Sequence, residues 1–299
     1  MSLTAPPRPA GVPTGRARPR RRPVAGRRGP WDRVQPVVAL LAVLALLGVP
    51  LWMVLVTSAK SQAEAANPNL ALPSQWQLLE NYAEVWQDGR VPLAFLGSLV
   101  IIVPTVAVVL VVGSLASWVL ARRSSRAMAV LYAVGISGIV LPPAVVTVVL
   151  LLRQLGLDGT VPGMVGVYTG MYLSTVIFFV TGFVRTVPRE LEEAARVDGA
   201  GPLKVFGRIV LPLLVPVLAT ATILISLYVW NDVFYAFFVL GGRVDTLPLN
   251  LFQVASAGLY LDNWHLIFAY VVLMSLPLLL VFAVAQRRII SGVTSGAVK

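Results

Sequence analysis

The sequence has no cysteine, one histidine and few charged residues. The lack of cysteine excludes disulfides, thiol nucleophiles and zinc sites built on thiolates. The single histidine, His265, leaves no pair of imidazoles for a metal ion or a proton relay. Charged residues make up 12% of the chain, against about 25% in ordinary soluble domains. We therefore predict no metal site and no catalytic residues, and the low charge points away from a soluble protein.

Nucleotide-binding motifs are missing as well. No Gly-x-x-x-x-Gly-Lys-Ser/Thr run occurs, and none of the three lysines follows a glycine, so no loop of this kind can cradle a phosphate. His-Glu-x-x-His and Gly-x-Ser-x-Gly are also lacking. We expect that the chain is not an enzyme, binds no cofactor, and takes any energy that it needs from a partner.

What the sequence has in abundance is apolar residues. They make up 57% of the 299 residues, and the mean hydropathy is +0.82. Six stretches approach or exceed the roughly 20 residues that cross a bilayer as a helix. They are residues 34–57, 91–120, 128–152, 161–184, 209–240 and 266–285. Prolines 104, 142, 143, 216 and 277 fall inside them, which predicts bent helices packed in a bundle. The sequence thus predicts an all-α membrane protein with six transmembrane helices.

The basic residues are distributed unevenly around these stretches. Of the 24 Lys and Arg residues, 20 lie in residues 1–33, 121–127, 185–208 and 287–299, which six crossings place on one side. By the positive-inside bias that side is the cytoplasm, so both termini are predicted to be cytoplasmic. The arginines of the first 33 residues would also suit a nucleic-acid arm, but beside a membrane span they are more often a topogenic signal. We therefore predict no nucleic-acid partner for the net charge of +11.

These patterns divide the chain into five parts. Residues 1–33 are an Arg- and Pro-rich tail that we expect to be disordered, residues 34–57 the first transmembrane helix, and residues 58–90 an external loop. The external loop includes a short helical patch at 78–86, which either lies on the outer membrane face or contacts an external partner. Residues 91–290 form a five-helix core, and residues 291–299 a cytoplasmic tail.

Within the core, the polar loop 185–212 is predicted to form two short helices. Glu190, Glu192 and Glu193 suit the positive end of a first helix, and Gly199 suits the left-handed residue that ends it. Pro202 is then placed to begin a second helix. Without further information this loop would be an ordinary amphipathic connector between two spans.

The spacing of Glu193-Ala194-Ala195, Gly199, Ile209, Leu211 and Pro212 resembles the EAA loop of the membrane subunits of ABC importers. In that family the loop carries a coupling helix that docks on a separate ATPase. The resemblance implies a type I ABC importer permease architecture with a cytoplasmic coupling-helix loop. The residues that it assigns to ATPase coupling are Glu193, Ala194, Ala195, Asp198, Gly199, Ala200, Phe206, Ile209, Leu211 and Pro212.

Further segments are similar to the carbohydrate-import branch of these permeases, in particular to the second membrane subunit of maltose importers. They are Trp230-Asn231-Asp232, Thr246-Leu247-Pro248-Leu249, Asp262-Asn263-Trp264, Gln286-Arg287 and the ending Ser295 to Lys299. The resemblance implies import of a sugar or oligosaccharide across the cytoplasmic membrane of a bacterium. It also implies a heterodimer with a second permease, two ATP-binding subunits that use ATP and Mg, and an extracytoplasmic solute-binding protein.

Asp232 is the only acidic residue clearly inside a predicted span. Counted along a helix from Leu213 it lies some 28 Å on, near the outer rim of a core about 30 Å thick. It is either a structural carboxylate bonded to a neighbouring helix or a group that contacts solute. The residues that we assign to a substrate pathway are Tyr172, Tyr228, Trp230, Asn231 and Asp232, because sugars favour aromatic faces beside amides.

Three functions remain open at this point. A carbohydrate permease leads, and a permease for a non-sugar solute is the alternative within the same family. An ion-coupled secondary transporter would need ionisable groups inside the membrane, for which one aspartate at the rim is a poor basis. No group of residues supports an intramembrane enzyme.

Overall fold

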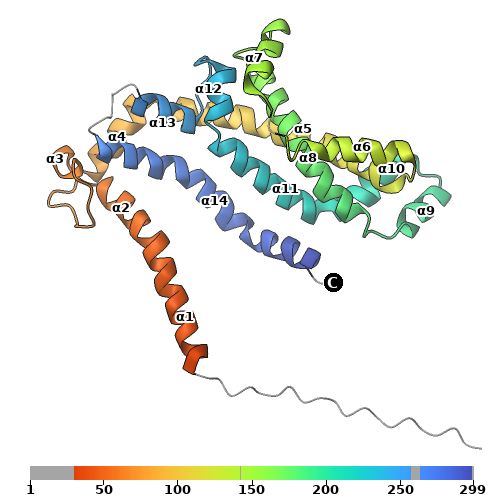
Figure 1. The fold of residues 1–299 in the computed structure, drawn as a ribbon, viewed down its shortest axis with the longest axis horizontal. Coiled ribbons are helices and arrows are strands. Elements are labelled where there is room, and N and C mark those ends of the chain that lie inside the picture. Colours follow the sequence, from red (N-terminus) through yellow and green to blue (C-terminus); the bar gives the residue numbers. More distant parts are fainter. Residues whose placement is uncertain (1–29, 142, 257–262, 298–299) are drawn as a thin grey trace, which may run out of the picture. The chain divides into compact units, whose positions relative to one another are not determined.

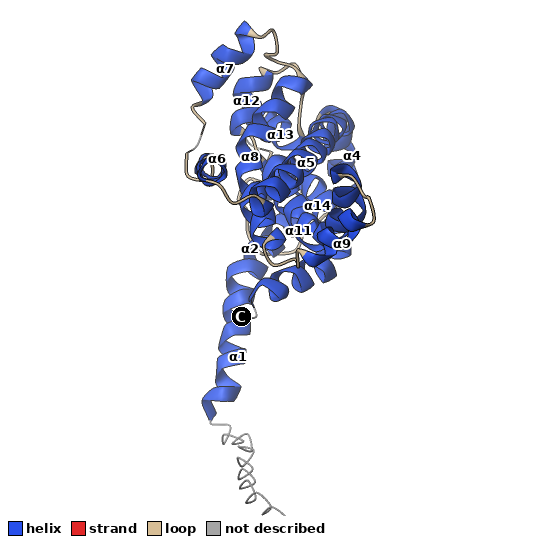
Figure 2. Ribbon diagram, turned by 90° about the vertical axis from the view of Figure 1, so that its right-hand side faces the viewer, coloured by secondary structure: helices blue, strands red, loops and turns tan. Residues whose placement is uncertain are grey.

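The computed structural model describes residues 30–141, 143–256 and 263–297, and every regular element in these residues is a helix (Figures 1 and 2). The elements in chain order are α1 Pro30–Val43, the π-turn η1 Leu44–Gly48, α2 Val49–Thr57, α3 Gln62–Ala65, α4 Leu78–Asp88, α5 Val91–Arg122, α6 Arg126–Ser137, α7 Val145–Gln154, α8 Val161–Val184, α9 Glu190–Val197, α10 Pro202–Val205, the π-turn η2 Phe206–Val210, α11 Leu211–Asn231, α12 Phe234–Leu240, α13 Leu247–Ser256 and α14 Trp264–Ala297. Most of the predicted N-terminal tail, Pro142, Asp262 and the last two residues lie outside the described residues.

The chain divides into two units, Met1–Val49 and Pro50–Lys299. In the described part of the first unit, α1 continues into the short π-helix η1. The large apolar side chains of α1 are exposed from Val34 onward. The run Val34–Thr57 is 24 residues long and apolar enough to cross a membrane, as the sequence predicts for the first span.

The second unit is built around four long helices, α5, α8, α11 and α14 (Figure 1). Helix α5 packs along α8, and α11 lies against α5, α8 and α14. Close packing of α5 on α8 requires a glycine at position 113, where an added Cβ would lie 2.6 Å from Val176 Cγ1. Small residues at such crossings allow membrane helices to pack closely. Together with the first span, these helices give five that are long and apolar enough to cross a membrane in the described residues.

Each of these helices also has an exposed apolar side. Leu93, Val103 and Val111 on α5 and Leu279 on α14 are all more than half exposed. In water such a surface would be unfavourable, but lipid tails are as apolar as these side chains. The buried side chains, in contrast, include several Ser and Thr residues, such as Ser98 and Ser117 on α5.

The third predicted span, 128–152, is not one helix. The structure has two short apolar helices there, α6 and α7, separated at residues 138–144. Gly138 ends α6, and a residue before a proline is disfavoured in the helical conformation, so the Pro142-Pro143 pair works against a continuous helix. The Tyr235 hydroxyl of α12 donates to the carbonyl of Pro143 at 3.2 Å, which ties the break to the bundle.

The fifth predicted span, 209–240, also ends earlier than expected. Helix α11 stops at Asn231, and the chain turns at Asp232 before the short helix α12. Towards its N-terminal end, α11 is extended through η2 and α10, so that Pro202–Asn231 is a run of 30 residues. The last span begins at Trp264, two residues before the predicted start.

Segment 58–90 is organised by buried polar groups. Asn81 of α4 donates its amide hydrogens to the carbonyls of Ser58 and Lys60, both at 2.9 Å. The Lys60 ammonium is buried and donates to Asn69 Oδ1 at 2.7 Å. These bonds fix the chain after α2 against α4. Helix α4 itself confirms the helical patch predicted at 78–86 and runs on to Asp88.

A second contact in this segment joins Glu64 of α3 to Ser74. The Ser74 hydroxyl and its backbone amide both donate to the Glu64 carboxylate. The hydroxyl bond is the main cause that lowers the pKa of Glu64 below its usual value, because both donors favour the charged form.

Candidate coupling loop and membrane pathway

Loop 185–212 leaves α8 and forms two short helices, α9 and α10, before α11 (Figure 1). Helix α9 has three glutamates in its first turn, as its dipole favours, and it ends at Val197. Gly199 then adopts a left-handed conformation with φ +79°, and the amide of Ala200 donates to the Ala195 carbonyl at 2.9 Å. The helix end and the left-handed glycine that the sequence predicts are both confirmed, and α10 begins at Pro202 as expected.

The residues assigned to coupling fall into an exposed and a buried group. Glu193, Ala194, Asp198 and Gly199 are exposed, and Leu211 and Pro212 are exposed at the start of α11. Ala195, Ala200 and Ile209 are partly buried. Phe206 is only 9% exposed and packs on Trp118 of α5, with ring centroids 5.5 Å apart. Phe206 therefore fixes the loop to the bundle and lies off its outer face.

Three further apolar side chains of the loop were not among the residues assigned to ATPase coupling. Val197 is 88% exposed and Leu203 is 79% exposed, and Leu191 of α9 is also exposed. Each stands alone in the sequence among charged and small residues, so neither the helical pattern nor the motif spacing singles it out. The structure places them on a loop outside the long spans.

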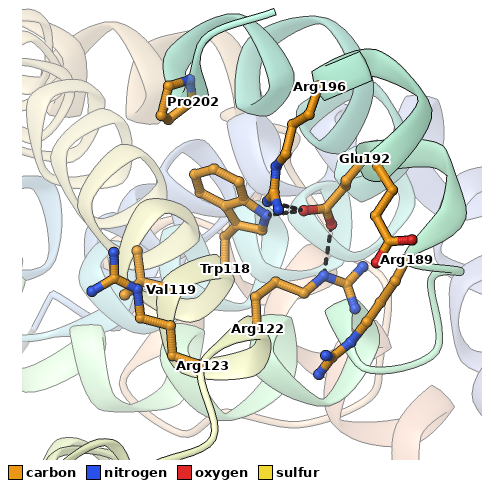
Figure 3. A pocket seen from close by; sticks show the side chains of 9 residues that line it. Trp118, Val119, Arg122, Arg123, Arg189, Glu192, Arg196 and Pro202 are labelled. Carbon is orange, nitrogen blue, oxygen red and sulfur yellow. Dashed lines mark hydrogen bonds and ion pairs between the residues drawn. The ribbon is translucent and has the colours of Figure 1, made fainter.

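A pocket of about 480 Å³ lies between the end of α5 and α9. Figure 3 shows Trp118, Arg122 and Arg196 directed at the carboxylate of Glu192. Glu192 is the only buried residue of α9, with 2% of its surface exposed. Its partners on α5 are about 70 residues away in the sequence, so no local pattern could have revealed this contact.

Asp232 lies where α11 ends, and all of its described contacts are hydrogen bonds. It accepts from the Tyr168 hydroxyl of α8 at 2.8 Å and from the amide of Ala236 at 3.0 Å. The second bond caps α12. Asp232 is thus bonded to a neighbouring helix, as in the structural alternative, and a direct contact with solute stays a prediction.

Beside Asp232, three tyrosines from α8 and α11 form a stack. The Tyr172 ring lies between Tyr168, at a centroid distance of 6.1 Å, and Tyr228, at 5.7 Å. The rings of Tyr172 and Tyr228 are only 11° from parallel. Tyr228 is 50% exposed, so one end of the stack is open.

Trp230 and Asn231 face away from this stack. Trp230 is buried, donates its indole N–H to the Met274 carbonyl of α14 at 3.2 Å, and meets Phe95 of α5 edge-on. Asn231 is exposed and lines a cavity of about 360 Å³ between α11 and α14. The structure therefore brings Tyr172, Tyr228 and Asp232 together and places Trp230 in a different contact.

A metal site is not formed by the residues that the structure describes. In those residues no three His, Asp or Glu side chains gather closely enough to hold an ion. The carboxylate of Asp232 is surrounded by hydrogen-bond donors, and that of Glu192 by donors of which two are cations.

Comparison with known proteins identifies the family. Residues 110–295 match the model of the binding-protein-dependent transport system inner membrane component. The chain belongs to this family. Binding-protein-dependent permeases are membrane components of ABC importers and are not themselves enzymes, so this chain is a multi-pass inner-membrane permease subunit of an ABC importer.

Individual relatives agree with this assignment over most of their length. The permease is 32% identical to the melibiose/raffinose/stachyose import permease protein MelC of Bacillus subtilis, over 88% of this chain and 96% of the relative. It is 32% identical to the diacetylchitobiose uptake system permease protein NgcG of Streptomyces coelicolor, over 83% of each chain.

A solved structure shows the same fold. The permease superposes with a TM-score of 0.73 on a chain of a bacterial ABC transporter that imports the acidic polysaccharide alginate. The match covers 87% of this chain and 98% of that chain at 22% sequence identity.

Proposed function

We propose that this permease imports a sugar or oligosaccharide as one half of a heterodimeric membrane domain. The observation that carries the proposal is the pair of relatives, each 32% identical over more than four fifths of the chain, whose names are those of oligosaccharide permeases. The second permease, two ATP-binding subunits and an extracytoplasmic solute-binding protein complete the importer. The alternative is a solute other than a sugar carried by the same machinery.

In this proposal α9 is the coupling helix that docks on an ATP-binding subunit. The exposed residues Glu193, Leu191 and Val197 of α9 support this role, and Leu203 of α10 is exposed on the same loop. Apolar side chains exposed on a polar loop favour contact with a protein partner, and a short helix fits into a groove. ATP and Mg are bound by that partner, and this chain binds no cofactor.

The substrate pathway that we propose runs along the open end of the tyrosine stack. Tyr172 and Tyr228 present nearly parallel rings from two helices, and sugars pack their apolar faces on such rings. Asp232 and Tyr168 hold α11, α12 and α8 in place around the stack, whereas Trp230 fixes α11 to α14. Asn231 lines a separate cavity between α11 and α14, so its contact with the substrate stays a prediction.

We further propose that the membrane is crossed six times, with both termini in the cytoplasm of a bacterium. Helices α6 and α7 together then make the crossing that is not continuous. Irregular backbone at membrane depth is tolerated where protein covers it, and the Tyr235–Pro143 bond ties this break to α12. Loop 185–212 lies on the cytoplasmic side and segment 58–90 outside, as the distribution of basic residues favours.

Deletion of the gene in its own organism, followed by growth and uptake assays with labelled sugars, tests the substrate class. The panel contains melibiose, raffinose, stachyose and N,N′-diacetylchitobiose, with proline as a solute that is not a sugar. We expect loss of uptake of one sugar class and its return when the intact gene is restored. Unchanged uptake of every sugar together with a loss for another solute would contradict the carbohydrate assignment.

A further inference from the structure

In helix α9, one carboxylate makes the described side-chain hydrogen bonds to a long helix of the bundle. Glu192 is the only buried residue of its eight, and an isolated helix of that length is not stable in water. Together with the partly buried Ala195, the contacts of Glu192 therefore hold α9 in position. Those contacts lie at the end of α5, beside the pocket shown in Figure 3.

Both oxygens of this carboxylate are occupied by donors from α5. Arg122 Nε donates to Glu192 Oε1 at 2.6 Å, and Trp118 Nε1 donates to Glu192 Oε2 at 3.0 Å. Arg196, one turn further along α9, adds a longer ion pair at 3.5 Å. The Arg122 and Glu192 side chains are 11% and 3% exposed, so water screens their attraction little.

The same two residues of α5 also hold the rest of the loop. Arg122 Nη2 donates to the Val187 carbonyl before α9, at 3.0 Å. The indole of Trp118 packs on Phe206 after α10. The end of α5 thus contacts the segment before α9, α9 itself and the segment after α10.

At its other end, α5 reaches the membrane segment assigned to the pathway. Phe95 of α5 packs edge-on against Trp230 of α11, with ring centroids 6.1 Å apart, next to Asn231. Between these two contacts α5 is one helix of 32 residues packed along α8. A continuous helix therefore joins the Glu192 contact to the Phe95–Trp230 contact beside Asn231.

We infer that Glu192, Arg122 and Trp118 form a link that carries displacements of α9 along α5 to the Phe95–Trp230 contact. This inference rests on the proposed function, because it assumes that α9 docks on the ATPase. All three are positioning residues. None of them is among the motif residues assigned to ATPase coupling. Separating this buried charge pair is unfavourable, because it leaves each charge buried and unpaired. The pair therefore keeps α9 and α5 together when α9 is displaced.

The test uses the complete importer in lipid nanodiscs, with a single cysteine introduced by Asn231→Cys into the cysteine-free chain. The rate of maleimide labelling at this cysteine is measured without nucleotide and after trapping with MgATP and vanadate. We expect nucleotide to change this rate when the link is intact. With Glu192→Gln, which keeps the volume and removes the charge, the nucleotide effect should shrink by about fivefold or more.

Glu190→Gln is the matched control, because it makes the same chemical change on an exposed residue of the same helix turn. It should leave the nucleotide effect unchanged. The double change Arg122→Glu with Glu192→Arg restores opposite charges, and it should recover part of the effect that each single change removes. Such recovery would not follow from general damage to the fold.

The outcomes separate this inference from the proposed function. Equal nucleotide effects in Glu192→Gln and Glu190→Gln would overturn the link. It would also be overturned if nucleotide did not change the labelling rate at Asn231→Cys although the binding protein still stimulates ATP hydrolysis. If reduced assembly of Glu192→Gln accounts for the whole loss, so that the nucleotide effect per assembled complex is unchanged, the link is also wrong. Lack of any stimulated ATP hydrolysis by the importer with the native chain would instead contradict the proposed function.

Discussion

At the scale of single residues, backbone conformation at Gly199 is the most specific requirement of the loop. Its φ of +79° is readily adopted by glycine, and a side chain there would cost roughly 1–2 kcal/mol from local strain alone. Space is not the constraint, because an added Cβ at Gly199 would meet nothing within 4 Å. Any effect of a larger residue on transport therefore reports the shape of the loop or its contact with a partner.

We predict that Gly199→Val lowers uptake per assembled complex by more than about tenfold, since a β-branched residue disfavours the left-handed end of α9. Gly201→Val is the matched control, because Gly201 is equally open but has an ordinary extended conformation with φ −68°. Uptake and ATP hydrolysis are measured with both variants in reconstituted importer. Equal losses in the two would show that bulk, and not backbone conformation, is what the loop rejects.

The hydroxyl of Tyr168 makes a second residue-level prediction, about stability. Tyr168→Phe keeps the ring in the tyrosine stack but removes the donor to Asp232. An acceptor that loses a partner costs about 1–3 kcal/mol, so the melting temperature in detergent should fall by several degrees. Tyr132→Phe is the control, because the Tyr132 ring contacts Arg185 while no described residue bonds its hydroxyl. A fall of the same size in both variants would argue against a structural role for the Tyr168–Asp232 bond.

Tyr228 gives the third residue-level prediction, about transport. Tyr228→Leu removes the open face of the stack, and the apparent affinity for sugar in uptake should fall by about two- to tenfold while assembly is preserved. The control is Phe178→Leu, which removes an aromatic ring of similar exposure, 48% against 50%, from α8 and outside the tyrosine stack. Initial uptake rates over a range of sugar concentrations distinguish the two. An unchanged apparent affinity in Tyr228→Leu would remove the stack from the pathway.

At the scale of elements, the break between α6 and α7 is the least expected feature and has a direct test. Ser124 precedes α6 and Gln154 ends α7, and both are exposed. If the two helices together cross the bilayer, Gln154→Cys should react with a membrane-impermeant maleimide in intact cells, and Ser124→Cys only after permeabilisation. Labelling of both positions from the same side would show that α6 and α7 do not make a crossing.

Much of this architecture could be predicted from the sequence, because long apolar runs indicate membrane helices whatever their neighbours. Helix α9, the left-handed Gly199 and the start of α10 at Pro202 were also predictable, since they follow from local preferences. The residues at which the spans end were less predictable. Asp232 turns the chain and caps α12, and at residues 138–144 a pair of prolines interrupts a run whose composition alone suggests a continuous span.

The contacts of the site were only partly predictable. Tyr172, Tyr228 and Asp232 do lie together, but Trp230 points to α14, because periodicity along one helix does not say which neighbour each side faces. The partner of Glu192 is Arg122 on a helix two spans earlier, and only the packing of α9 against α5 brings them within 2.6 Å. Burial of this glutamate thus depends on tertiary structure.

At the scale of the whole molecule, the proposed function assigns the movement of this permease to its partner subunits. The described intramembrane residues offer one clear carboxylate, Asp232, and its hydrogen bonds hold α8, α11 and α12 together. An ion-coupled transporter would need groups that gain and lose charge during the cycle. In the proposed function, ATP hydrolysis on a docked subunit supplies the energy instead, through differential contacts with the loop.

The central claim is therefore tested most directly by transport in proteoliposomes that hold this permease, its partner permease and the ATP-binding subunits. Uptake of the sugar identified by the growth panel is measured with and without internal ATP, with and without the solute-binding protein, and after a proton ionophore or a sodium ionophore has collapsed the corresponding ion gradient. The account predicts uptake that requires both ATP and the binding protein and is unaffected by either ionophore. Uptake that proceeds without ATP, or that stops when either ion gradient is collapsed, would contradict it.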